Sequence, residues 1–161
     1  KTIKIIKLNQ FKDFRGKYIE TFNKKKYQKK FGINFVQDDF SYSKKNILRG
    51  FHGDDGTWKL FTCVSGKIQF AVINFNKKDK NFLKNFSIIL KNEDNLQVLV
   101  PPKHGVAHLV LSDDTILNYK QSTYYQQFKQ FTINYQSKIL NFKWLSKTII
   151  TSKRDSSGIF L

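Results

Sequence analysis

The sequence has little of what crosslinks a small fold or interrupts its strands: one cysteine, two prolines and no methionine among 161 residues. The single Cys63 cannot form an internal disulfide, and it lies inside an apolar run. We therefore interpret Cys63 as a small core residue and expect a reducing, cytoplasmic environment. Because the chain begins at Lys1 and contains no methionine, we expect its natural start to lie upstream.

Long apolar runs are absent as well. No stretch approaches the roughly 20 apolar residues of a membrane-spanning helix, and residues 1–9 lack the apolar core and cleavage site of a signal peptide. We therefore expect no membrane partner. A chain of 161 residues without an evident linker or repeat predicts a single domain over residues 1–161.

Arginine is scarce in a strongly basic chain. The formal charge is +17, yet of 29 basic residues only Arg15, Arg49 and Arg154 are arginines. The lysines are spread along the whole chain, so we interpret them as a compositional bias of the surface and expect no nucleic-acid partner, with a basic nucleic-acid-binding domain as an alternative. Where lysine serves almost everywhere, an arginine indicates a need for its bidentate fork, as at a phosphate or carboxylate.

Short strand-like segments recur through the sequence, separated by polar, glycine-containing or proline-containing connections. Spacings of about ten residues in the second half are typical of an antiparallel sandwich or barrel. The segments are residues 3–8, 17–22, 35–37, 40–42, 67–74, 86–90, 96–100, 107–111, 115–120 and 131–133. We predict an all-β antiparallel jelly roll of two sheets.

Helix signals are few. Residues 23–30 form the only good helix candidate in the first half, and we expect one or two short helices in all. Residues 124–130 are ambiguous, and residues 139–146 predict a final loop or edge segment.

The densest chemistry lies in residues 46–66, NILRGFHGDDGTWKLFTCVSG. Arg49 and His52 follow a strand-like pair, and Lys59 opens a strand-like run. The tight Gly-Asp-Asp-Gly connection therefore has Arg49 and His52 before it and Lys59 after it. This pattern predicts a basic pocket at strand ends, suited to proton transfer by His52. Asp155 is the distant candidate for a carboxylate that orients the ring, and Tyr119 for a proton donor on an opposite wall.

Other reaction chemistries find no support in the motifs. The histidines are His52, His104 and His108, and no His-x-His pair exists. His104 and His108 are spaced for a helix, but prolines at 101–102 and a glycine at 105 argue against one, so we expect no metal. The sequence has no nucleophile elbow and no glycine-rich dinucleotide or phosphate loop, and we expect no cofactor.

Several motifs occur in an order that points to one family. Residues 13–20, DFRGKYIE, look like D-x-RG-x-F-x-E, residues 35–41, FVQDDFS, like FVQDN-x-S, and residues 48–52, LRGFH, like LRG-[LI]-H. The remaining blocks are KL with VSG at 59–66, GVAH at 105–108, YK with YY at 119–125, and SKRD at 152–155. Together they resemble the dTDP-4-dehydrorhamnose 3,5-epimerase family of metal-independent cupins, over nearly the whole chain.

This resemblance implies a homodimeric enzyme, an isomerase acting on a nucleotide-diphosphate sugar without a cofactor. His52 would remove the proton beside a 4-keto group, Asp155 would be its partner, Lys59 would face the enolate oxygen, and Tyr119 would return a proton on the other face. The implied substrate-binding residues are Arg15 and Arg49 at the diphosphate, Gln37 and His108 at the sugar, Tyr18 and Glu20 near the base or across a dimer interface, and Asp39 and Ser41 in the FVQDDFS block.

Two departures from the family pattern bear on the substrate. Asp39 stands where the family commonly has asparagine, and HGDDGTWKL at 52–60 looks more like a branch acting on GDP-4-keto-6-deoxy-heptoses in capsule synthesis. We therefore expect an epimerase inverting C3, and C5 as well, of a GDP-4-keto-6-deoxy-heptose through an enolate. The alternatives are a dTDP-4-keto-6-deoxyglucose 3,5-epimerase, a nucleotide-sugar 3,4-ketoisomerase and a catalytically silent sugar-binding cupin.

Overall fold

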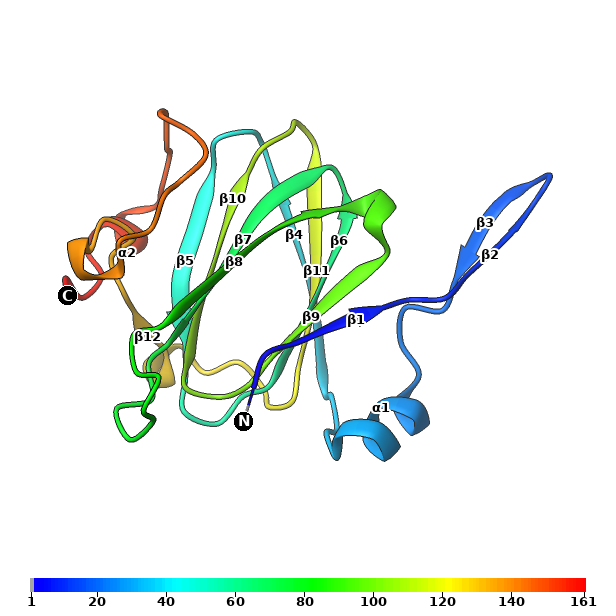
Figure 1. Ribbon diagram of the computed structural model, residues 1–161, viewed down its shortest axis with the longest axis horizontal. Helices are drawn as coiled ribbons and strands as arrows, with labels where there is room; N and C mark the ends of the chain where they lie inside the picture. The colour runs from blue at the N-terminus through cyan, green and yellow to red at the C-terminus, as the bar shows by residue number, and fades with distance from the viewer. Residues whose placement is uncertain (1) are drawn as a thin grey trace.

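The computed structural model describes residues 2–161 as two five-stranded antiparallel sheets that face each other across a common core (Figure 1). In spatial order the first sheet contains β1 (Lys4–Lys7), β9 (Leu96–Val100), β6 (Lys59–Ser65), β11 (Thr115–Gln121) and β4 (Gln37–Ser43). The second contains β12 (Phe131–Thr132), β5 (Leu48–Gly53), β10 (His104–Val110), β7 (Lys67–Asn74) and β8 (Asn85–Lys91). The predicted all-β jelly roll is confirmed.

Helical structure is limited to short pieces. The helices are α1 (Lys24–Phe31) and α2 (Lys153–Ser156), with 3-10 turns η1 (Asn92–Asp94), η2 (Gln127–Lys129) and η3 (Lys138–Leu140). The ambiguous segment at 124–130 is thus a loop with one turn, and the segment at 139–146 begins in η3 and continues as a loop.

Helix α1 lies where the sequence predicts it. The Asn23 side chain accepts a hydrogen bond from the Lys26 amide at 3.2 Å, and Gly32 ends the helix in the left-handed region at φ 68°. Tyr27 is the buried residue of the helix, in a cluster that includes Ile33, Leu60 and Leu99. The helix therefore closes the outer side of the first sheet.

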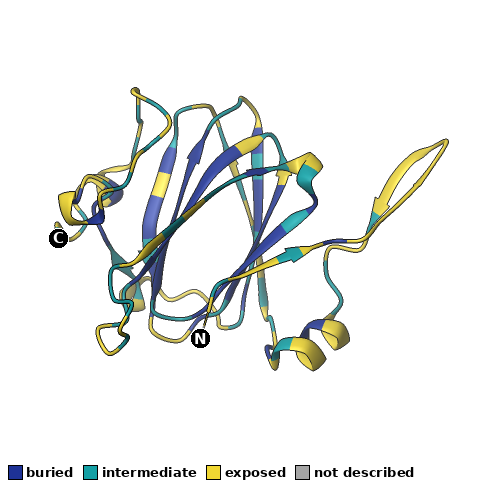
Figure 2. Ribbon diagram, viewed as in Figure 1, coloured by how far each residue is buried: buried dark blue, intermediate teal, exposed yellow. Residues whose placement is uncertain are grey.

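The core lies between the sheets and is built from their alternating inward side chains. Its central cluster includes Phe61, Phe70, Val98 and Leu117, all nearly inaccessible to solvent (Figure 2). Cys63 belongs to this cluster, and burial raises the pKa of its thiol to about 11. A thiolate is thus not available at neutral pH, which agrees with the interpretation of Cys63 as a core residue.

A two-stranded hairpin, β2 (Gln10–Asp13) with β3 (Gly16–Ile19), projects from the body of the molecule (Figure 1). Strand β3 ends earlier than the predicted strand at residues 17–22, because the chain turns there toward α1. The hairpin is exposed on both faces, and Phe14 at its tip is 97% exposed (Figure 2). Two strands alone cannot bury a core, so the apolar side chains of this hairpin, called the arm below, remain exposed and are available to bind another surface.

Candidate active site

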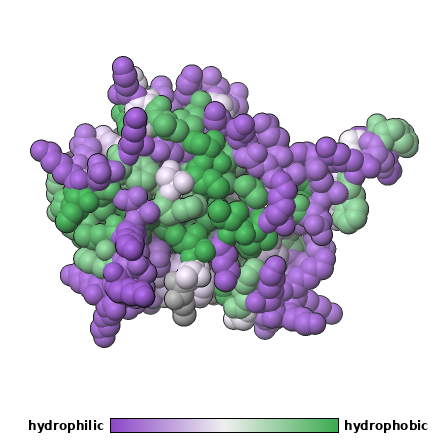
Figure 3. All heavy atoms as spheres, viewed as in Figure 1, coloured by the Kyte–Doolittle hydropathy of each residue, from purple (hydrophilic) through white to green (hydrophobic). Residues whose placement is uncertain are grey.

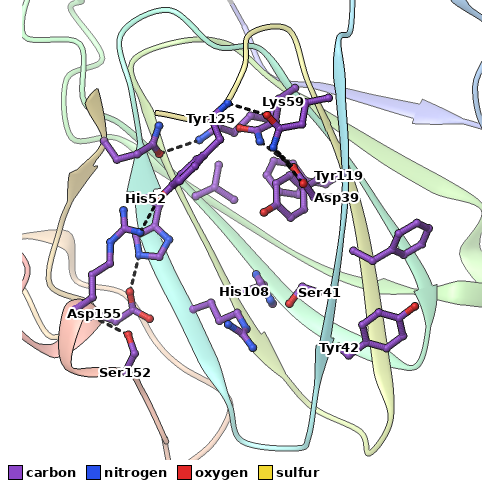
Figure 4. Close-up of a pocket in the computed structure, with 18 residues that line it drawn as sticks. Asp39, Ser41, Tyr42, His52, Lys59, His108, Tyr119, Tyr125, Ser152 and Asp155 are labelled. Carbon is purple, nitrogen blue, oxygen red and sulfur yellow. Dashed lines mark hydrogen bonds and ion pairs between the residues drawn. The ribbon is translucent and has the colours of Figure 1, made fainter. Parts of the chain in front are cut away.

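A cavity of about 610 Å³ opens between the sheets (Figure 4). Its lining includes the predicted residues His52, Lys59, Tyr119, Asp155, Gln37, Asp39, Ser41, Arg49 and His108. Strands β4, β5, β6, β10 and β11 and helix α2 contribute these side chains. Arg15, Tyr18 and Glu20 belong to the projecting arm and the segment after it, and they do not line the cavity of their own chain.

His52 and Asp155 meet although 103 residues separate them in the sequence (Figure 4). His52 Nε2 lies 2.5 Å from Asp155 Oδ1, and Asp155 is 2% exposed. Burial raises the pKa of Asp155, but hydrogen bonds from His52, Ser152 and the Gly50 backbone outweigh it and hold the pKa below its ordinary value. Because an ionised carboxylate can only accept hydrogen bonds, Nε2 of His52 is the donor to Asp155.

The pairing of β5 with β10 places His52 and His108 on the same side of the cavity. A Cβ on Gly50, whose φ is 114°, would lie 2.3 Å from the Val106 carbonyl oxygen, so only glycine allows this approach. The approach brings His108 on β10 opposite Arg49 on β5. Burial, then Arg49 and His52, lower the pKa of His108 to about 3, which makes it a neutral imidazole in the cavity wall. Its Nε2 is buried and has no hydrogen-bond partner within residues 2–161.

Lys59 places a cation at the start of β6. Its Nζ lies 3.5 Å from Asp54 Oδ2 and 3.5 Å from Gln130 Oε1, and the residue is 8% exposed. Burial lowers the pKa of Lys59, Asp54 partly offsets that effect, and Arg154 lowers the pKa further. An ammonium with little water around it interacts strongly with charge that develops on a bound molecule.

Tyr119 occupies the sheet opposite His52. Its ring stacks on Phe61 with centroids 5.4 Å apart, and it lines the same cavity. Burial, followed by the Asp39 carboxylate, raises the pKa of Tyr119, so the phenol keeps its proton at neutral pH. Asp39 itself accepts hydrogen bonds from Gln37 Nε2 at 2.9 Å and Gln121 Nε2 at 2.9 Å.

Some residues that line the cavity were not predicted from the sequence. Arg154 lines the cavity and its Nη1 lies 3.3 Å from the Tyr125 hydroxyl, yet only the other two arginines were assigned to a phosphate. The scarcity of arginine was a signal that applied to Arg154 equally. Gln121, at the end of β11, and Tyr125, in the YK and YY block, also line the cavity but were given no role, and Gln130 lies in a loop whose sequence has no periodic pattern.

Within the described part of the chain, no group of three or more His, Cys, Asp or Glu side chains is arranged to hold a metal ion. None of the helices in residues 2–161 is long and apolar enough to cross a membrane.

Comparison with known proteins gives the family. The family model for dTDP-4-dehydrorhamnose 3,5-epimerase matches residues 1–161. The chain belongs to this family. It is therefore an isomerase, an epimerase of nucleotide-linked 4-keto-6-deoxy sugars, and the predicted enzyme class is confirmed. The dTDP-4-dehydrorhamnose 3,5-epimerase of Shigella flexneri is 30% identical over 153 residues, which are 92% of this chain and 84% of that protein.

Solved structures of epimerases superpose closely on this one. The Legionella pneumophila enzyme, solved with dTDP-4-keto-L-rhamnose, is 28% identical with a TM-score of 0.92 over 97% of this chain and 86% of that chain. The Bacillus anthracis enzyme, solved with TDP and pyrophosphate, is 28% identical with a TM-score of 0.93 over 99% and 94%. A 3'-monoepimerase from Streptomyces bikiniensis, 24% identical, shares the fold with a TM-score of 0.91 over 97% and 82%.

The preference for a GDP-heptose finds no support in these relatives, which are named for dTDP sugars. The structure gives a physical reason. Within HGDDGTWKL, the stretch that suggested the heptose branch, His52 and Lys59 line the cavity but residues 53–58 do not, and Asp54 pairs with Lys59 and with its own turn. The dTDP alternative therefore fits the epimerase better.

Proposed function

We propose that the epimerase inverts C3 and C5 of a dTDP-linked 4-keto-6-deoxy-hexose. The observation that carries this proposal is the hydrogen bond of 2.5 Å between His52 and Asp155, in one cavity with Lys59 and Tyr119 (Figure 4). A base on one sheet, an acid on the other and a cation at the cavity wall are the parts that inversion beside a ketone requires.

Proton abstraction is the first step of the proposed reaction. The proton on C3 passes to Nδ1 of His52, and the electrons of the C–H bond form a double bond between C3 and C4. The carbonyl electrons move onto the oxygen at C4, where the Lys59 ammonium stabilises the negative charge as it forms. Asp155 stabilises the imidazolium that results, since its pKa lies below its ordinary value and it stays ionised.

Reprotonation completes the inversion. The enolate electrons return to C3 and take the phenolic proton of Tyr119 from the opposite face. Tyr119 then recovers a proton from solvent, and His52 releases the proton that it took, so the net reaction changes only configuration. C5 is also adjacent to the C4 ketone, and the same four side chains serve it.

Substrate binding is proposed for the polar lining of the cavity. Arg49 and Arg15 are assigned to the diphosphate, because a guanidinium offers two parallel donors to phosphate oxygens. Gln37, Ser41 and the neutral His108 are assigned to sugar hydroxyls. The carboxylate of Asp39 accepts hydrogen bonds only, so it selects for a donor group on the sugar.

Solvent isotope exchange tests the function directly. In deuterated buffer with dTDP-4-keto-6-deoxyglucose, we expect NMR to show deuterium at C3 and C5 with inversion at both carbons. Deuterium at C3 alone would identify a monoepimerase, and movement of the carbonyl carbon would identify a ketoisomerase. The GDP-linked heptose serves as comparator substrate. The proposal would be refuted if neither substrate gained deuterium at C3 or at C5.

We propose that the protein is a homodimer. The arm exposes Phe11, Phe14 and Tyr18, and Figure 3 shows apolar side chains gathered on the face over β8 and β9. Strands β1 and β8 are sheet edges, and Ile3, Phe86, Ile88 and Leu96 are only partly buried against the core. A second copy covers such edges and lets Arg15, Tyr18 and Glu20 reach its cavity.

Substitution of Arg15 by methionine tests the arm. We expect the KM of R15M for the dTDP sugar to rise about tenfold with little change in kcat, because a phosphate contact made equally in ground and transition states is lost. Sedimentation should show wild type and R15M at twice the mass of the chain. Lys12→Met, on the same hairpin, is the control and should leave KM unchanged. A monomer with wild-type activity would refute the dimeric site.

A further inference from the structure

The connection between the proposed base and the proposed cation contains a buried acid that has no part in the reaction steps. Strand β5 ends at Gly53, directly after His52, and β6 begins at Lys59. Asp54 in this connection is only 6% exposed. A buried carboxylate normally persists only where specific partners hold it, so its contacts indicate its role.

The two oxygens of Asp54 have separate partners. Oδ1 accepts hydrogen bonds from the backbone amides of Gly56 at 3.0 Å and Thr57 at 2.6 Å, which fixes the turn between the strands. Oδ2 accepts a hydrogen bond from Gln130 Nε2 at 3.0 Å and lies 3.5 Å from Lys59 Nζ. One oxygen therefore shapes the backbone, and the other contacts the cation.

Gln130 closes this group of side chains. Its Oε1 lies 3.5 Å from Lys59 Nζ, so Asp54, Gln130 and Lys59 each contact the other two. Lys59 and Gln130 line the cavity that contains His52. Asp54 does not line that cavity but a neighbouring one of about 780 Å³, and Gln130 borders both. Asp54 thus contacts the ammonium from outside the substrate cavity and can influence a substrate only through the side chains that it holds, Lys59 and Gln130.

We propose that Asp54 is a positioning residue, which holds the Lys59 ammonium charged and fixed at the wall of the substrate cavity. This inference rests on the proposed function, in which that ammonium faces the enolate oxygen. A buried ammonium has lost most of its water, and without a fixed anion it adopts other rotamers or loses its proton. A displacement of about 1 Å at a charge-stabilising group can lower a rate by about 100-fold.

The charged and titratable groups around Lys59 come from several elements. Burial and Arg154 lower its pKa, and Asp54 raises it. Asp54 itself stays ionised, because contacts with Thr57, Lys59, Gln130 and Gly56 outweigh the effect of burial and place its pKa below the ordinary value. The other ionisable groups that line the cavity with Lys59 are Asp39, Tyr42, Arg49, His52, His108, Tyr119, Tyr125 and Asp155.

The variant Asp54→Asn distinguishes the role of Oδ1 in the turn from the role of the charge beside Lys59. Asparagine keeps an Oδ1 acceptor for Gly56 and Thr57, so the turn is retained, while the charge beside Lys59 is lost. We expect kcat of D54N to fall about 10- to 100-fold with KM changed less than about twofold. Without the anion the pKa of Lys59 falls further, so the alkaline limb of the kcat profile should move to lower pH.

Asp55→Asn is the matched control. It removes the same charge one residue away, and the exposed Asp55 side chain makes no hydrogen bond or ion pair within residues 2–161. D55N should keep wild-type kcat and the wild-type alkaline limb. If D54N behaves like D55N in both measurements, Asp54 does not position Lys59. Should D54N fail to fold, Asp54→Ser is the second variant, since a serine hydroxyl also caps such a turn.

A titration of Lys59 separates this inference from the proposed function. In protein with ¹⁵Nζ-labelled lysine, the Lys59 resonance is assigned by its loss in Lys59→Met. We expect this resonance to titrate at lower pH in D54N than in wild type and D55N. The result does not depend on activity: an enzyme that epimerises no substrate refutes the function, whereas an unchanged titration in D54N refutes the role of Asp54.

Discussion

Replacement of His52 by asparagine is expected to lower kcat at least about 1,000-fold, because the proposed base that removes the proton beside the ketone is lost. The shorter asparagine amide takes the place of Nδ1 and does not reach Asp155, but the carboxylate keeps its hydrogen bonds with Ser152 and the Gly50 backbone, so we expect the fold to be retained. Binding of dTDP, measured by calorimetry, should therefore change little. Deuterium incorporation at C3 and C5 should fall in parallel with turnover, since exchange and inversion share this base.

His104→Asn is the matched control for this variant. His104 is buried on β10, but its Nδ1 lies 2.9 Å from the Pro102 carbonyl oxygen and it does not line the cavity. We expect H104N to keep wild-type turnover, with a small loss of thermal stability. Full isotope exchange in H52N would show that His52 is not the base.

Replacement of Tyr119 by phenylalanine is expected to separate exchange from inversion. The ring keeps its stacking on Phe61, but the proton donor on the second face is lost. Inversion should therefore slow by about 100- to 10,000-fold. His52 still forms the enolate, exchanges its proton with solvent and returns deuterium to the same face. NMR of the recovered substrate should thus show deuterium at C3 with retained configuration.

Tyr135→Phe removes the same hydroxyl outside the cavity, where Tyr135 packs against Trp144. This control should invert and exchange at the wild-type rate. Inversion by Y119F at the wild-type rate would identify another acid, and loss of exchange together with inversion would indicate that Tyr119 acts before the enolate forms.

The fold and the cavity differ in how far the sequence specifies them. Period-two patterns and regularly spaced connections predicted the sheets because strand burial is a local property of alternate side chains. Helix α1 was predictable from a lysine-rich segment with spaced aromatic residues, which is also a local pattern, and its cap at Asn23 and the glycine at its end were found in the structure. The motifs around His52, Tyr119 and Asp155 pointed to cavity residues, but they gave no role to Arg154, which lies beside Asp155 on α2, or to Gln130, which lies in a loop without a periodic pattern.

The segment Gly53–Trp58 shows the limit of motif reading. From its letters alone it suggested a different sugar, because HGDDGTWKL at 52–60 resembles a branch that acts on GDP-linked heptoses. In the folded chain Asp54 turns back onto its own backbone and onto Lys59, and the segment lies outside the cavity of His52. The direction of a side chain in a turn depends on which donors surround it, and Gln130 comes from a distant part of the chain.

The sequence by itself determined the all-β class, the single buried thiol, the scarcity of arginine and the residue types available for proton transfer, since each depends on local pattern or residue chemistry. Only the tertiary structure decided that His52 meets Asp155, that Tyr119 faces them from the other sheet, and that Asp54 contacts Lys59 from behind. These are contacts between residues up to 103 positions apart. They depend on how two sheets pack, and packing is a property of the whole chain.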